Sequence, residues 1–102
     1  MKEFEGKVAL ITGGSSGIGR ATAITFAQKG AKIVIASRRE KESEETVAMI
    51  QEVGSEAIFV KTDITQATEV ENLVNQTINT YNRLDYAFNN AGTEGILGPS
   101  IE

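Results

Sequence analysis

Residues 12–19, Thr-Gly-Gly-Ser-Ser-Gly-Ile-Gly, combine residue types that suit phosphate binding. They follow a short apolar run and precede a stretch with helical periodicity. Such a turn presents backbone N–H groups and the positive end of a helix dipole to one anion. Glycine allows positive φ angles and close approach of a ligand to the backbone. The pattern predicts a phosphate-binding turn, in which the expected contacts are Gly13, Ser15, Ser16, Gly17, Ile18 and Gly19.

Two alternatives exist for this glycine turn. It can be only a tight connection between a strand and a helix, with no ligand. A Walker-type phosphate loop is the nearest rival among binding motifs, but no Gly-Lys-Ser or Gly-Lys-Thr triplet follows the glycines.

Composition excludes most familiar catalytic centres. The chain has 102 residues with no cysteine and no histidine, so disulfides, thiolate or imidazole metal sites and histidine bases are absent. Acidic residues in segments 3–7 and 40–45 are interpreted as solvated charge, and no metal site is expected. Carboxylates, hydroxyls, tyrosines, lysines and backbone dipoles remain available for chemistry.

Alternating apolar runs and helical stretches must position these groups. Strands are predicted at residues 8–12, 33–36, 57–60 and 84–88, because short continuous apolar runs are typical of strands buried on both faces of a parallel sheet. Helices are predicted at about residues 17–29, 40–53 and 65–81. This alternation indicates an α/β fold with right-handed crossovers and helices on both faces of the sheet.

Two of these helices carry specific expectations. In the first, the predicted buried stripe is Ile18, Ala21, Ile24 and Ala27. The third is expected to be capped by Thr65 and ended by a left-handed Asn82. Its predicted buried stripe comprises Val70, Leu73, Val74, Thr77, Ile78 and Tyr81.

Length and charge limit the class of protein. A chain of 102 residues fits a single domain, and a formal net charge of −4 disfavours nucleic acid and anionic membranes as partners. The first residues lack the pattern of a secretory signal, so the expected location is the cytoplasm.

The glycine spacing is similar to the T-G-x-x-x-G-I-G pattern of the short-chain dehydrogenase/reductase family. A second segment, Asn89-Asn90-Ala91-Gly92, resembles the N-N-A-G signature of that family and follows the fourth predicted strand. The resemblance spans essentially the whole chain. It implies a partial Rossmann fold, with about four parallel strands in the order 3-2-1-4.

The resemblance also implies a dinucleotide cofactor. Family members that use NAD carry an acid at the end of the second strand, where this chain has Ser37 followed by Arg38 and Arg39. A guanidinium can bind a 2′-phosphate, so NADP is expected in preference to NAD. The alternative is that both arginines only pair with Glu40, Glu42 or Glu44. Further cofactor contacts implied by the resemblance are Asp63, Ile64, Asn90, Ala91 and Gly92.

Family chemistry is hydride transfer at a carbonyl or alcohol, with a Tyr-x-x-x-Lys pair that this chain lacks. No catalytic residue is therefore assigned, and the catalytic half is expected in an absent C-terminal part. The leading interpretation is the truncated cofactor-binding half of an oxidoreductase. The alternatives are a stand-alone nucleotide-binding or interaction module and a flavodoxin-like or receiver-like domain, although the N-N-A-G segment disfavours the last. An exposed fourth strand predicts self-association.

Overall fold

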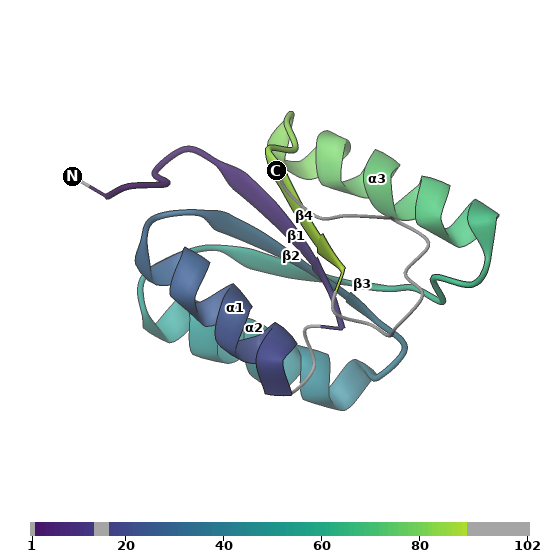
Figure 1. Ribbon diagram of the computed structural model, residues 1–102, viewed down its shortest axis with the longest axis horizontal. Helices are drawn as coiled ribbons and strands as arrows, with labels where there is room; N and C mark the ends of the chain where they lie inside the picture. Colours follow the sequence, from purple (N-terminus) through teal and green to yellow (C-terminus); the bar gives the residue numbers. More distant parts are fainter. Residues whose placement is uncertain (1, 14–16, 90–102) are drawn as a thin grey trace.

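A single parallel sheet forms the centre of the protein (Figure 1). The structure is a computed structural model that describes residues 2–13 and 17–89. Its strands are β1 (Val8–Thr12), β2 (Lys32–Ser37), β3 (Ala57–Lys61) and β4 (Tyr86–Asn89). They lie in the order β3-β2-β1-β4, and every neighbouring pair is parallel, which confirms the predicted α/β fold and strand order.

Helices cover both faces of the sheet, as predicted. They are α1 (Gly17–Gln28), α2 (Glu40–Glu52) and α3 (Ala67–Tyr81), with α1 and α2 together on one face and α3 on the other (Figure 1). Side chains of β1 alternate between the layers: Ala9 and Ile11 pack in the α1–α2 layer, and Val8 and Leu10 pack with Leu73 of α3. None of these described helices is long and apolar enough to cross a membrane.

Four aromatic rings extend the α1–α2 core toward β4. Phe4 stacks on Phe26 with ring centroids 4.8 Å apart, and Phe26 meets Phe88 edge-on, also at 4.8 Å. Tyr86 contacts both Phe4 and Phe26. Because β4 pairs only with β1 in this sheet, these ring contacts add side-chain packing to an edge strand.

The start of α3 differs from the prediction. The helix begins at Ala67 with Gln66 at its N-cap, and the Gln66 side chain makes no capping hydrogen bond. Thr65 is not the cap: it lies one position before the N-cap, and its N–H and hydroxyl both donate to Oδ1 of Asp63. The predicted end of α3 is confirmed: Asn82 has a φ of 67° and its N–H donates to the Ile78 carbonyl.

The predicted stripe of α1 is confirmed at Ala27 and wrong at Ile18 and Ala21, which are exposed. Ile18 is 76 % exposed, whereas Gly19, Ala23 and Ala27 are buried. A strict spacing of three residues drifts by about 60° at each step on a helix with 3.6 residues per turn. Residues 18 and 27 therefore lie on opposite sides of α1, and a spacing of four keeps Ala23 and Ala27 on one face.

Strand boundaries moved slightly. β4 begins at Tyr86 instead of Leu84 and extends to Asn89, and Asp85 contacts Val8 through its backbone and side chain just before the strand. β2 gains Lys32 and Ser37 at its two ends.

Candidate functional site

The predicted site residues that the structure describes lie where the four strands end. Thr12 lies opposite Ala36 of β2 and Asn89 of β4, and Ser37 lies opposite Lys61 of β3. The N–H of Gly13 donates to the Ala36 carbonyl at 2.9 Å, so the glycine turn leaves the sheet beside the end of β2. In open parallel sheets, ligands bind at this carboxyl edge.

The described ends of the glycine turn have the conformation that their residue type allows. Gly13 has a φ of 71° and Gly17 a φ of 60°, values that side chains with a Cβ rarely adopt. Helix α1 begins at Gly17, so the last residues of the glycine turn belong to the first helical turn, whose N–H groups have no partner within the helix. Ile18 is exposed and Gly19 is buried. Ser15 and Ser16 lie outside the described residues.

The segment after β2 brings two cations to the same edge. Ser37 is buried, and its Oγ accepts a hydrogen bond from the N–H of Arg39 at 2.8 Å. Arg38 and Arg39 are exposed. Over the described ranges, ion pairs join Arg20 to Glu45, Lys29 to Glu3 and Arg83 to Asp85. The expected alternative, in which Arg38 and Arg39 pair with glutamates of α2, is not formed among these contacts.

Asp63 lies in the connection that follows β3. Its Oδ1 accepts hydrogen bonds from the Thr65 hydroxyl at 2.6 Å and from the Thr65 N–H at 3.0 Å. These bonds are the main reason why the pKa of Asp63 lies below its ordinary value, and the charge of Arg38 lowers it further. The charge of Arg38 therefore acts on Asp63, although the two side chains form no ion pair among the described contacts. Ile64 beside them is half-buried.

Thr12 joins β1 to β4 at the same edge, a role that sequence reasoning missed. Its hydroxyl is 3.0 Å from Oδ1 of Asn89 and 3.2 Å from the Phe88 carbonyl. The available signal was a hydroxyl residue at the end of a fully apolar strand, where it needs a buried partner. Asn90, Ala91 and Gly92 lie outside the described residues.

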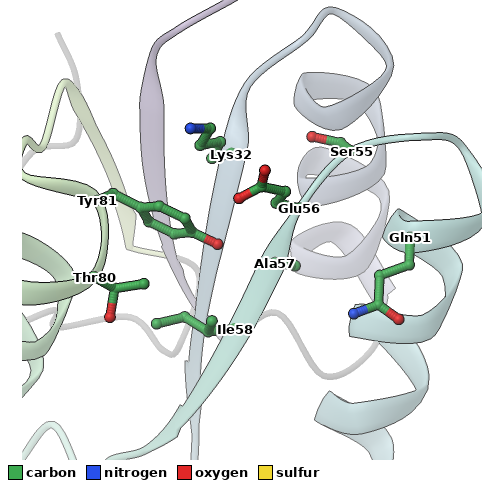
Figure 2. A pocket seen from close by; sticks show the side chains of 8 residues that line it. All are labelled: Lys32, Gln51, Ser55, Glu56, Ala57, Ile58, Thr80 and Tyr81. Atoms are coloured by element: carbon green, nitrogen blue, oxygen red, sulfur yellow. The ribbon is translucent and has the colours of Figure 1, made fainter.

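A separate hollow of about 570 Å³ lies at the other end of the sheet, where β2 and β3 begin (Figure 2). Lys32 and Ala57, the first residues of β2 and β3, line it together with Glu56 and Tyr81. The Lys32 ammonium lies 5.5 Å from the centroid of the Tyr81 ring. Burial, with a smaller effect of the Glu56 charge, raises the pKa of Tyr81. This hollow is remote from the glycine turn, since it opens where the strands begin.

A parallel sheet in this order, with a glycine turn between its first strand and first helix, defines a Rossmann-type α/β domain. The family model for short chain dehydrogenases matches residues 7–101. The chain therefore belongs to the short-chain dehydrogenase/reductase family, as the glycine and N-N-A-G motifs predicted.

Individual relatives agree. An uncharacterised oxidoreductase of Thermotoga maritima is 46% identical over 89 residues, which cover 87% of this chain and 35% of the relative. Tropinone reductase-like 2 of Erythroxylum coca is 46% identical over 91 residues, covering 89% of this chain and 32% of the relative. The chain thus spans about a third of the length of these relatives.

Solved structures show the same likeness. NAD⁺-bound xylitol dehydrogenase superposes with a TM-score of 0.87 at 35% identity, over 92% of this chain and 36% of that one. A short-chain dehydrogenase/reductase from Burkholderia phymatum in complex with NAD gives a TM-score of 0.80 at 37% identity, over 85% and 31% of the two chains.

Proposed function

We propose that this chain is the NADP(H)-binding N-terminal portion of a short-chain dehydrogenase/reductase oxidoreductase. The observation that carries the proposal is the position of Arg38. This exposed guanidinium follows Ser37 at the end of β2, next to the strand that leads into the glycine turn. A dinucleotide whose pyrophosphate lies over the glycine turn would bring its adenine ribose toward Ser37 and Arg38.

Coenzyme choice depends on the residues at the end of β2. Two of the similar structures contain NAD, so family membership alone does not select the coenzyme. A carboxylate at position 37 would repel a 2′-phosphate, whereas the neutral Ser37 does not. Arg38 is free of ion pairs among the described contacts and can form a charge-assisted pair with the phosphate. Both features favour NADP.

Calorimetric titration of the chain with NADPH and NADH tests the coenzyme. A charge-assisted contact corresponds to about one to two decades in affinity, so NADPH is expected to bind about 10- to 100-fold more tightly. Arg38→Gln should remove most of this difference and leave NADH binding unchanged. Equal affinities for the two coenzymes, or tighter NADH, would contradict the proposal.

The proposed reaction of the whole protein is hydride transfer between nicotinamide and a carbonyl or alcohol. This chain has no Tyr-x-x-x-Lys pair to exchange the substrate proton, so we propose that it binds the coenzyme without turning over substrate. The alternative is a stand-alone nucleotide-binding or interaction module. Reading the gene downstream of residue 102 separates the two, because an in-frame Tyr-x-x-x-Lys segment supports the oxidoreductase and a stop codon supports the module.

We also propose that the isolated chain self-associates through β4. This strand pairs only with β1, so its other edge carries backbone groups without a strand partner in this sheet. Sedimentation velocity at increasing concentration is expected to show a dimer or larger species. A single monomeric species at high concentration would argue against this surface.

A further inference from the structure

The guanidinium of Arg20 joins α1 to α2. Its Nε donates to the Thr46 hydroxyl at 2.8 Å, and its Nη2 donates to the Glu42 carbonyl at 2.9 Å. A longer contact of 3.4 Å reaches the carboxylate of Glu45. Only 23% of the Arg20 side chain is exposed, whereas half of the Glu45 side chain is. The two shorter contacts are therefore the ones that fix the geometry.

These contacts connect the starts of the two helices. Arg20 lies in the first turn of α1, directly after the glycine turn, and Glu42 lies in the first turn of α2, three residues after Arg39. Each helix thus begins beside one half of the candidate site. Below them, the Gly13 N–H and the Ala36 carbonyl join the corresponding strand ends. Arg20 makes a second connection between the same two segments, this time between the helices that follow the strands.

An apolar residue at position 20 would be sufficient if the contact between α1 and α2 required only close packing. Farther along α1, Ala23 and Ala27 are buried in the same cluster as Ile50 of α2 without any polar contact between them. Arg20 instead has a planar guanidinium whose N–H donors point in fixed directions. Its hydrogen bonds to α2 therefore constrain both the distance between the two helices and their orientation. A guanidinium held in this way gives the two helix starts a defined spacing.

We propose that Arg20 is a positioning residue for the dinucleotide: it holds the glycine turn and the Ser37–Arg39 segment at the spacing that one bound cofactor must span. The inference rests on the proposed function. A ligand that contacts both segments benefits from their fixed spacing, because less ordering accompanies its binding. A ligand that contacts one segment does not. The positioning role therefore predicts selective weakening of ligands that bridge the site.

The test compares bridging and single-segment ligands on the same variants. Arg20→Met keeps an apolar stem and removes every donor. NADPH and NADH are titrated by calorimetry, and inorganic pyrophosphate and adenosine 2′-phosphate by NMR chemical shifts, which report weak binding. We expect Arg20→Met to weaken the preferred coenzyme about tenfold, since small misplacements of a site are costly. Pyrophosphate and adenosine 2′-phosphate should change less than about twofold.

Two further variants complete the test. Lys29→Met removes the exposed ion pair that Lys29, directly after the end of α1, forms with Glu3, and it should leave all four ligands unaffected. Thr46→Val removes the acceptor of Arg20 Nε and should reproduce the selective loss in part, so a poorly folded Arg20→Met does not end the experiment.

The outcomes are distinct. Equal weakening of the coenzyme and of both fragments in Arg20→Met and Thr46→Val would assign Arg20 a general structural role and overturn the inference. Unchanged coenzyme affinity would overturn it as well, while leaving the proposed function intact. If the unmodified chain binds neither coenzyme, the proposed function itself fails at the first titration, and this inference fails with it.

Discussion

The carboxylate of Asp85 accepts a hydrogen bond at 2.8 Å from the backbone N–H of Val8, 77 positions earlier in the chain. Val8 is the first residue of β1, and Asp85 directly precedes β4. The N–H of Asp85 donates to the Val8 carbonyl in return, at 2.9 Å. Arg83 holds the same carboxylate through contacts of 2.8 and 2.9 Å. This reciprocal pair fixes where the edge strand enters the sheet.

Asp85→Asn is expected to destabilise the fold. The substitution keeps the size of the side chain but removes the charge that strengthens the bond to Val8 and the contact with Arg83. Hydrogen bonds to charged groups contribute about 1.5–3 kcal/mol, and the neutral amide recovers part of this, so a loss of about 1 kcal/mol is expected. Urea denaturation measures it. Glu71→Gln, at an exposed position of α3, is the matched control and should have no measurable effect.

Stability should also fall in acid through Asp85. The hydrogen bonds from Arg83 hold the pKa of its carboxyl below the ordinary value, and the bond from the Val8 N–H lowers it further. A lowered pKa in the folded state contributes stability that is complete above the unfolded-state pKa and is lost as the pH falls through the folded-state value. The loss therefore begins below about pH 4. Melting temperatures measured from pH 6 downward should converge for wild type and Asp85→Asn; a constant gap would contradict this.

Gly30→Ala is expected to be costly for two reasons. Its φ of 100° disfavours any side chain, and an added Cβ would lie 2.9 Å from Cβ of Lys2 and 3.0 Å from the backbone of Glu5. Gly54 is the matched control, because its φ is 92° but nothing lies within 4 Å of its added Cβ. Gly54→Ala should cost about 1–2 kcal/mol, and Gly30→Ala clearly more. Similar losses for the two variants in chemical denaturation would show that the N-terminal segment moves aside.

Ser43→Ala is expected to leave stability unchanged or to raise it. The Ser43 Oγ is buried on α2 and has no hydrogen-bond partner in the part of the chain that the structure describes, so its desolvation is uncompensated there. Alanine also has the higher helix propensity. Ser55→Ala is the contrasting variant, since the Ser55 hydroxyl donates to the Ala31 carbonyl and its loss should cost about 1 kcal/mol. Thermal unfolding of both variants decides; a destabilised Ser43→Ala would reveal a partner for its hydroxyl in solution.

Much of the fold was accessible from the sequence because its signals are local. Apolar runs located all four strands, and Asn82 ended α3 as predicted. The errors arose at two places: the start of α3, which depends on non-helical contacts before it, and the buried face of α1, which depends on the exact helical period. Thr65 is a good capping residue in isolation, but it bonds to Asp63 in the turn before α3, and the helix begins two positions later at Ala67. Ile18 is apolar and in phase with its neighbours over one turn, yet three-residue spacing moves it to the exposed side of α1.

The common location of the motifs at the ends of the strands was predictable for a similar reason. Parallel strands bring their carboxyl ends to one edge, so motifs after β1, β2 and β3 had to converge. Side-chain contacts between elements that are distant in the sequence could not be predicted from it. Arg20 shares a face of α1 with Ala23 and Ala27, which is a signal that it is partly buried, but nothing local identifies Thr46 and Glu42 as its partners.

Ser37→Asp is expected to reverse the proposed coenzyme preference. The Ser37 Oγ accepts the Arg39 N–H, and an aspartate oxygen can accept the same bond, so the segment should keep its conformation. The new carboxylate would accept hydrogen bonds from ribose hydroxyls and repel a 2′-phosphate. We expect NADPH affinity to fall about tenfold or more while NADH affinity rises, both measured by calorimetry. Ser37→Asn is the neutral control. Repulsion of a 2′-phosphate would weaken the binding of NADPH alone. If Ser37→Asp instead weakens both coenzymes equally, Ser37 only maintains the conformation of its segment and does not determine which ribose is bound.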